Sequence, residues 1–436
     1  MNKYGMKTLA FAAAMTSSVA WGQVPSTEEY MYGPSKEIKL PEPFATESAT
    51  RRTSVVGWEE GKMPVVPEGF TVKKFAGDLD HPRWAYVLPN KDVLISEGNT
   101  YSKVPGVREA QQLVGVSADR VTLFRDADND GVAEEKHVLL EDLNQPFGMA
   151  YLDGQLYIAN TDALVRYSYE LGSDDKITAE PEHILDIPAG GYNHHWTRNV
   201  IPDKDGKHLL LTIGSSSNVG EHGMEKEEQR AKVFRVDPTS KKMEQIAWGL
   251  RNPNGLDFNP ANDELWTSVN ERDELGDNLV PDYVTSVEEG GFYGWPYKYY
   301  GDHIDPRWAD KMPEDLPEET LVPDYAVGPH TAAMDLAFYT ADAYPEKYHN
   351  GLFVSQHGSW NRAKYAGYKV IFIPFENGEP SGQPEDFITG FLKDEAADEV
   401  YGRPTGLVMH PNGMLLSVDD DGNTVWSVQY TGDQKE

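Results

Sequence analysis

The sequence predicts an all-β protein, a six-bladed β-propeller, and three observations support this fold class. One phrase recurs along the chain: a short apolar strand, a turn rich in Pro, Asp, Asn and Gly, and a second apolar strand, often followed by a third. The turns are mostly Asp-Gly, Asn-Gly or close relatives, which favour hairpins. The spacing between copies varies, which is expected if loops at one rim carry a functional site.

Six copies of this phrase are present. They begin at Trp84, Gly148, Asn199, Gly255, Asp335 and Gly406. Such a unit can bury both faces of its small sheet only against neighbouring copies, which favours radial closure. Residues 70–77 form a lone strand before the first copy, and we expect it to pair with residues 424–430 and fasten the ring. Two unrelated β domains are the alternative, which no linker-like change in composition within residues 68–430 supports.

The N-terminus predicts export to the periplasm or the medium. Two lysines precede an apolar run over residues 8–19, and small residues suit cleavage after Ala20 or Gly22. Residues 1–22 are therefore predicted to be a signal peptide, with an uncleaved anchor as the alternative.

The rest of the chain divides into two parts. Residues 23–67 are rich in Pro, Glu, Ser and Thr and are predicted to be an extended lead-in that wraps the domain surface. Residues 68–432 are predicted to form the propeller.

Composition excludes several classes of function. The formal net charge of −32 disfavours nucleic acid and anionic membranes as partners. With no cysteine, the chain has no disulfide, thiolate zinc site, iron–sulfur cluster or cysteine nucleophile. It also lacks the G-x-S-x-G, H-E-x-x-H, P-loop and Rossmann motifs, so a nicotinamide enzyme is disfavoured. The acidic surface either keeps the protein soluble or includes carboxylates that hold divalent cations.

Two adjacent histidines precede the third copy. His194 and His195 lie in GGYNHHWTRN, together with Arg198. An imidazole can accept a proton near neutral pH and a guanidinium can stabilise an anion, so His195 and Arg198 are candidate catalytic residues. Because neighbours in a strand point to opposite faces, we expect only one of the two histidines to face a central pocket. The alternative is that both cap strands.

Cationic side chains recur at corresponding ends of later copies. Arg251 precedes the fourth copy, His357 and Arg362 follow a strand of the fifth, and Arg403 opens the sixth. In an acidic protein this recurrence suggests a bound polyanion, and an arginine fork suits carboxylate or quinone oxygens. The alternative for each is a structural ion pair or a surface position.

Two acidic stretches are candidate cation sites. The loop over residues 270–284 is dense in carboxylates, and hard cations such as Ca²⁺ take side-chain and backbone oxygens from such loops. Asp126, Asp128 and Asp130 resemble the opening of a calcium loop, although its twelfth position is His137 and not Glu. A solvated loop and an Asx-rich turn are the respective alternatives.

Six phrases in order, HWTRN, GLRNPNGL, NERDELGDNLVPDY, GGFYGWPY, HGSWNR and GRPTGL, resemble the glucose/sorbosone dehydrogenase family. The L-sorbosone dehydrogenase branch looks closest, and the resemblance spans about residues 65–430. It implies a soluble six-bladed propeller that uses pyrroloquinoline quinone (PQQ) and Ca²⁺ to oxidise sugars.

The resemblance also implies roles for single residues. His195 corresponds to the family's general base, with His194 as the alternative register. Arg272 and Asp273 correspond to the positions whose backbone carbonyls hold the cofactor-bound Ca²⁺.

Cofactor contacts are implied at three further places. Arg251 and Asn252 match the family's Arg-Asn pair, and Arg403 matches the arginine that opens the last repeat. Glucose-oxidising relatives carry a lysine where this chain reads QHGSWNR, so His357 or Arg362 would take its place. Since PQQ carries carboxylates, arginines and Ca²⁺ would neutralise a charge that the acidic protein otherwise repels.

We therefore expect an exported PQQ-dependent dehydrogenase that oxidises an aldose or sorbosone-like sugar to a lactone or acid. Its electrons would pass to a soluble acceptor such as a cytochrome, with no nucleic-acid partner and no membrane insertion after signal cleavage. One alternative is a Ca²⁺-dependent propeller lactonase, in which carboxylates and asparagines converge on a central metal. Another is a non-catalytic propeller that binds glycan or protein.

Overall fold

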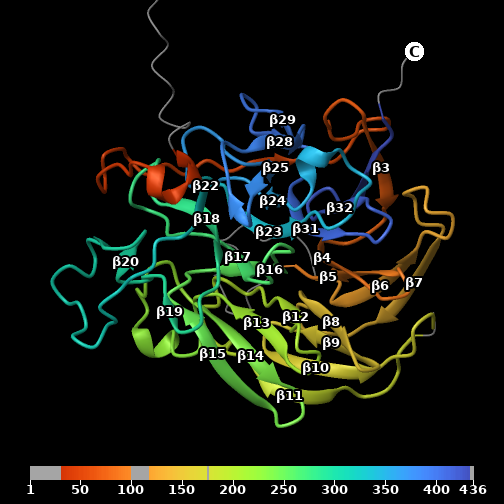
Figure 1. Cartoon of the computed structure of the whole chain (residues 1–436), viewed down its shortest axis with the longest axis horizontal. Coiled ribbons are helices and arrows are strands. Elements are labelled where there is room, and N and C mark those ends of the chain that lie inside the picture. The colour runs from red at the N-terminus through yellow and green to blue at the C-terminus, as the bar shows by residue number, and fades with distance from the viewer. Residues whose placement is uncertain (1–30, 100–116, 174–175, 433–436) are drawn as a thin grey trace, which may run out of the picture.

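Strands make up almost all of the regular structure, as Figure 1 shows for the computed structural model, which describes residues 31–99, 117–173 and 176–432. Within these ranges the helical segments are three short 3-10 turns, η2 (Ser35–Glu37), η3 (Met224–Lys226) and η4 (Glu346–Tyr348). The all-β prediction is confirmed. No helix in the described ranges combines the length and apolar character needed to cross a membrane. The predicted signal peptide lies outside the described residues.

Six sheets of four or five strands dominate the fold, and we number them in chain order. The first sheet contains β4 (Pro82–Val87), β5 (Val93–Glu97), β6 (Arg120–Arg125) and β7 (Glu135–Leu140). The second contains β8 (Met149–Leu152), β9 (Gln155–Ala159), β10 (Ala163–Ser168) and β11 (Glu182–Asp186). The third contains β12 (Val200–Pro202), β13 (Leu209–Ile213), β14 (Lys232–Asp237), β15 (Lys242–Trp248) and β19 (Gly291–Phe292).

The remaining three sheets follow the same antiparallel order. The fourth contains β16 (Pro253–Phe258), β17 (Leu265–Val269), β18 (Pro281–Ser286), β22 (Tyr325–Pro329) and β1 (Tyr32–Pro34). The fifth contains β23 (Ala333–Phe338), β24 (Leu352–Gln356), β25 (Lys369–Ile373) and β28 (Glu385–Ile388). The sixth contains β31 (Pro404–Met409), β32 (Leu415–Asp419), β33 (Thr424–Tyr430) and β3 (Phe70–Ala76). Each predicted copy supplies the first two strands of one sheet.

Small hairpins decorate this framework. They are the pairs β20 (Lys298–Tyr299) with β21 (His303–Ile304) and β26 (Phe375–Glu376) with β27 (Glu379–Pro380). A further small sheet joins β2 (Ser54–Val55), β30 (Glu399–Val400) and β29 (Leu392–Asp394).

Hydrophobic clusters fill the spaces between neighbouring sheets. Each of six clusters combines buried residues of one sheet with those of the next, and the sixth sheet meets the first through residues such as Val418 and Ile95. The first strands contact one another in the order β4, β8, β12, β16, β23, β31, and β31 contacts β4. The sheets therefore follow one another in a cycle around a common centre, as Figure 1 shows.

The sixth sheet joins the last described strand of the chain to the strand that precedes the first copy. Strand β3 pairs antiparallel with β33, from Phe70 opposite Tyr430 to Ala76 opposite Val425. This pairing confirms the predicted fastening strand. It places a segment that precedes the first copy at the outer edge of the last sheet.

Glycines alternate with larger residues at the start of the six first strands, in the order Trp84, Gly148, Asn199, Gly255, Asp335 and Gly406. Each glycine lets the next sheet's first strand approach closely. A Cβ on Gly148 would lie 2.4 Å from the backbone nitrogen of Val200, and one on Gly255 would lie 2.7 Å from that of Leu336. Contacts this short cannot form without a shift of the backbone.

We expect Gly148→Ala to destabilise the protein by about 1–3 kcal/mol, because the added methyl overlaps the backbone of the neighbouring sheet. Urea unfolding would measure the change. Gly190→Ala is the matched control, since a Cβ there would meet nothing within 4 Å. Equal unfolding midpoints for the two variants would contradict a tight contact between the second and third sheets.

Candidate active site

One cavity of about 270 Å³ brings together most of the residues that the sequence singles out. Because first strands start and second strands end at the same edge of an antiparallel sheet, loops from the third to sixth sheets meet there. Most of its lining is titratable or charged: His194, His195, Arg251, Glu271, Asp273, Asp282, His330, His357 and Arg403. Asn270, Ala332, Met334, Gly358 and Trp360 complete it. His195, Arg251 and Arg403 thus share one cavity.

His195 is held in one tautomer. Its Nδ1 lies 3.0 Å from the carbonyl oxygen of Ser215 and 2.8 Å from the Ser215 hydroxyl, which itself donates to the carbonyl of Ser217 at 2.6 Å. Since both oxygens accept from the ring, Nδ1 carries the proton and Nε2 keeps a lone pair. Burial, followed by the charge of Arg251, lowers the pKa of His195 well below its usual value. The ring is therefore a neutral imidazole at neutral pH.

Both adjacent histidines line the cavity, so the expectation that only one would face it is wrong. They lie in the loop before β12, which begins at Val200, and the alternation of a strand does not apply to them. Their rings meet edge to face, with centroids 4.6 Å apart. The Tyr192 hydroxyl lies 3.0 Å from Nδ1 of His194, and burial lowers the pKa of His194 to about 4.

Arg198 does not reach the cavity, which corrects its expected catalytic place. Its side chain is fully buried and donates to the carbonyl oxygens of Thr161, Pro188, His195 and Thr197. Its guanidinium also donates to Oδ1 of Asn193 at 3.1 Å. These bonds use the N–H groups of the guanidinium, so Arg198 holds the histidine loop in position.

Arg251 lies in the wall of the cavity and organises the acidic loop after β17. Its guanidinium donates to the carbonyls of Asn270 and Glu271 and forms an ion pair with Asp273 at 3.1 Å. Burial alone would raise the pKa of Asp273, but the hydrogen bond to His330 and the charge of Arg251 bring it down to about 2. Asp273 is therefore ionised and held between Arg251 and His330.

Two expected site residues lie behind this wall. The side chain of Arg272 pairs with Asp305 at 3.0 Å and is not among the lining residues. Asn252 donates to Asn270, and no donor among the described residues reaches its buried Oδ1. Asn270 takes the place in the lining that the sequence suggested for Asn252. The expectation for Arg272 concerned its backbone carbonyl, and that stays a prediction.

Two buried carboxyls share the acidic corner of the cavity. Burial raises the pKa of Glu271 to about 7 and that of Asp282 to about 6. The Asp282 carboxylate accepts from the backbone nitrogens of Glu271 and Ala332 and from the Thr331 hydroxyl. A bound cation would favour the charged forms of both carboxyls, and the donor set is all oxygen, as Ca²⁺ requires.

The opposite side of the cavity carries His357 and Arg403. His357 Nε2 lies 2.9 and 3.0 Å from the two carboxylate oxygens of Asp420, which also bonds Arg83. Arg403 donates to the carbonyls of His357 and Gly358 at 2.9 and 2.7 Å. Asp420 thereby joins the first, fifth and sixth sheets. Burial would raise its pKa, but the neighbouring His357, Arg83 and Arg403 hold it well below the usual value.

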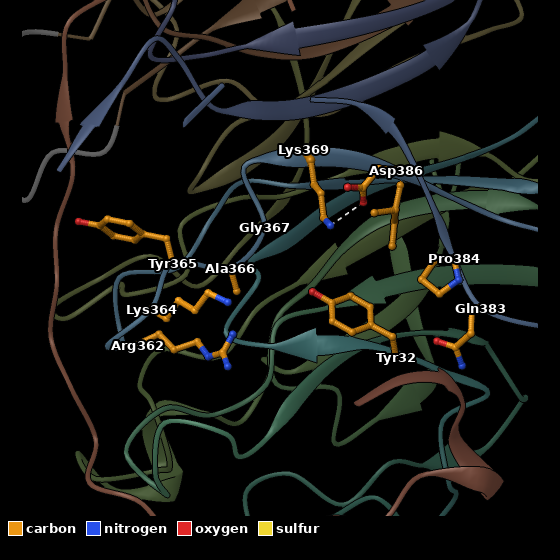
Figure 2. A pocket seen from close by; sticks show the side chains of 11 residues that line it. Tyr32, Arg362, Lys364, Tyr365, Ala366, Gly367, Lys369, Gln383, Pro384 and Asp386 are labelled. Atoms are coloured by element: carbon orange, nitrogen blue, oxygen red, sulfur yellow. Dashed lines mark hydrogen bonds and ion pairs between the residues drawn. The ribbon is translucent and has the colours of Figure 1, made fainter. Parts of the chain in front are cut away.

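Arg362 lies in a different place from the one expected. It lines a separate cavity of about 340 Å³ together with Lys364, Lys369 and Tyr32, as Figure 2 shows. Its guanidinium donates to the carbonyl of Asp277 and to Oδ1 of Asn278. Of the two candidates for the family's lysine position, only His357 lines the cavity that contains His195.

The Asp126 motif forms the turn between β6 and β7. Four carboxylates gather in this turn, each with one oxygen within 4.8 Å of the others: those of Asp126, Asp128, Asp130 and Glu134. They accept hydrogen bonds from backbone nitrogens within the turn, as an Asx-rich turn does, and Asp130 also pairs with Lys73 at 3.1 Å. A calcium site there stays a prediction.

The sequence interpretation missed His330, Trp360 and Asp420. His330 follows no recognisable motif, so nothing local could have identified it. Trp360 lies beside Arg362 and Asp420 beside Gly422, and in each stretch the arginine or the turn glycine is the stronger sequence signal. A carboxylate directly after the second strand of the last copy was an available signal for Asp420.

Comparisons with known proteins agree with this picture. The chain is 26% identical over 376 residues to an uncharacterized protein of Borreliella burgdorferi, covering 84% of this chain and 90% of that one. It is 24% identical over 414 residues to the pyrroloquinoline quinone-dependent pyranose dehydrogenase of Coprinopsis cinerea, covering 82% of this chain. The match spans 53% of that enzyme, so this chain corresponds to about half of it.

Solved structures share the fold. The calcium structure of a Trichoderma reesei carbohydrate-active enzyme of family AA12 superposes with a TM-score of 0.68 at 17% identity, over 87% of this chain and 99% of that one. The holo form of the PQQ domain of the Coprinopsis cinerea pyranose dehydrogenase gives 0.67 at 18% identity, over 86% and 98%. A model of the TrAA12-like family matches residues 64–286 and 312–431. This match covers well over half of the chain, which therefore belongs to the TrAA12-like family.

Proposed function

We propose that this protein is an exported PQQ-dependent sugar dehydrogenase on a six-bladed β-propeller. It oxidises an aldose or sorbosone-like sugar at its aldehyde or anomeric carbon to a lactone or acid, and a soluble acceptor such as a cytochrome takes the electrons. The cyclic order of the six sheets supports the blade count. The PQQ-dependent relative supports the cofactor.

The observation that carries the proposal is one cavity in which an oriented imidazole faces two arginines. His195, with its proton fixed on Nδ1, offers Nε2 as a general base for a sugar hydroxyl. When bound, PQQ supplies the acceptor for the hydride that leaves the sugar carbon. Arg198 keeps the base in place through the carbonyl of His195.

The residues present fit such a cofactor. Arg403 would pair with its carboxylates, with His357 beside it in the same wall. Arg251 would act through its charge alone, because its N–H groups all bond protein oxygens. The acidic corner would provide oxygen ligands for Ca²⁺ from the carboxyls of Glu271 and Asp282, and we propose that the backbone carbonyls of Arg272 and Asp273 contribute too. The corner and the arginines thus provide for both a cation and a polyanion.

Reconstitution tests the proposal directly. The protein would be mixed with PQQ and Ca²⁺, and a panel of aldoses and sorbosone would be screened for dye reduction. We expect dye reduction that requires both additions. If the reconstituted protein binds PQQ but reduces no dye with any sugar, the proposal is wrong.

The Ca²⁺-dependent lactonase remains a second candidate because Asn270, Glu271, Asp273 and Asp282 share one corner of the cavity. A lactonase has no use for Arg403 and would hydrolyse lactones with Ca²⁺ alone. Lactone hydrolysis without PQQ, together with no quinone-dependent dye reduction, would favour it.

We expect the His195 ring to stay neutral across the physiological range in the cofactor-free protein. Burial and the charges of Arg251 and Arg230 lower its pKa and oppose its protonation. Its NMR signal, identified by comparison with His195→Gln, should therefore not titrate between about pH 5.5 and 8. Because the unfolded chain takes up this proton near pH 6.5, the folded state should also lose stability as the pH falls below about 6.5. An NMR titration midpoint for His195 at or above about pH 6.5 would contradict a buried, neutral base.

A further inference from the structure

A segment of the lead-in, residues 44–55, crosses the loops that border the cavity, and we call it the strap. On one side it holds the acidic loop after β17. The Phe44 nitrogen donates to the carbonyl of Leu275 at 2.7 Å, and the nitrogens of Gly276 and Asp277 donate to the hydroxyls of Ser48 and Thr46. This loop supplies Glu271 and Asp273 to the cavity.

On its other side the strap holds the loop after β24. The Arg51 nitrogen donates to the carbonyl of Trp360 at 2.9 Å, and Asn361 Nδ2 donates to the carbonyl of Ala49 at 2.9 Å. The Arg51 side chain anchors the strap through an ion pair with Asp398 at 2.8 Å. The strap therefore ties together two loops that both contribute to the cavity, although the family match begins only at residue 64.

The strap also places a positively charged side chain, Arg52, beside a residue that lines the cavity. The Arg52 guanidinium carbon lies 5.2 Å from the ring centroid of Trp360, which lines the cavity. Arg52 is exposed and forms no ion pair with any described residue, in a chain with 71 acidic side chains. A guanidinium stacked on an aromatic ring keeps its N–H donors in the plane of the fork, where they suit a carboxylate.

We propose that Arg52 and Trp360 form a subsite for an acidic sugar, one that bears a carboxylate away from the carbon that is oxidised. The inference rests on the proposed sugar dehydrogenase activity and adds a substrate class to it. Trp360 offers an apolar ring surface to the sugar, and Arg52 pairs with its carboxylate. Specificity then comes from the strap, outside the part of the chain that matches the family.

The test compares D-glucuronate with D-glucose on the reconstituted protein. Arg52→Gln should lower the ratio of kcat/KM for glucuronate over glucose about two- to fivefold, the range of an exposed ion pair, mainly through the KM for glucuronate. Lys62→Gln is the matched control, because it removes the same charge from an exposed lead-in position. That variant should leave the ratio unchanged.

A binding measurement separates this inference from the activity on which it rests. Calorimetric titration of glucuronate into the PQQ-loaded protein should show weaker binding for Arg52→Gln than for Lys62→Gln. If no sugar is oxidised, the dehydrogenase proposal fails, and the titration still reports on the subsite. If sugars are oxidised but Arg52→Gln changes neither the ratio nor the glucuronate affinity, the subsite is overturned.

Discussion

His195→Ala should bind PQQ and Ca²⁺ but lose sugar oxidation by a factor of about 10²–10⁴, the usual contribution of a positioned general base. The imidazole offers its free nitrogen to the cavity, and its other nitrogen is committed to Ser215. No arginine in the wall can replace it as a base, because a guanidinium stays protonated. Stopped-flow or steady-state dye reduction would measure the loss, and the quinone absorbance would report cofactor binding.

His194→Ala is the matched control for this experiment. Both rings line the same cavity and touch each other, so comparing the two variants shows which histidine acts as the base. We expect His194→Ala to retain most of the turnover. If His194→Ala loses turnover by a factor of about 10²–10⁴ while His195→Ala stays active, the assignment of the base is reversed.

Arg403→Ala should weaken PQQ binding by about 10- to 100-fold, since a charge-assisted hydrogen bond contributes about 1.5–3 kcal/mol. Arg403 lines the cavity and is held through the carbonyls of His357 and Gly358, which orient its fork. Fluorescence or calorimetric titration of PQQ into the Ca²⁺-loaded protein would give the dissociation constant.

Arg362→Ala provides the comparison for Arg403→Ala. This variant also removes one positive charge. Arg362, however, lies in the loop after the second strand of the fifth sheet and lines the other cavity. We expect it to change the PQQ dissociation constant little. Equal losses for the two variants would mean that bulk charge, and not the fork of Arg403, governs cofactor binding. Arg403→Lys, which keeps the charge and loses the fork, would then bind as tightly as the parent protein.

The sequence predicted the fold well because its signals are local. Short apolar strands and the turns between them mark the first two strands of every sheet, and they need no knowledge of distant residues. The pairing of β3 with β33 was also predictable, because a single unmatched strand at one end complements a sheet that lacks a partner at the other.

The candidate site was harder to predict because it depends on contacts across sheets. Arg198 and Arg251 look alike in the sequence and both donate to carbonyl oxygens, yet Arg198 lies behind the histidine loop and Arg251 lies in the cavity wall. The position of Asp420 directly after a strand is a local signal, but its pairing with His357 and Arg83 joins three sheets and cannot be read from that position. The two histidines misled the prediction because they lie in a loop where strand alternation does not apply.

The pairing of β3 with β33 also has a consequence for biosynthesis. The partner of residues near position 70 is made only when residues near position 430 have been synthesised, so the last sheet closes through a contact between residues that lie far apart in the sequence. Arg403 and Asp420 belong to that same last-made sheet, so a nascent chain that lacks it has no complete cofactor pocket. The pocket would therefore be completed only when this long-range contact forms.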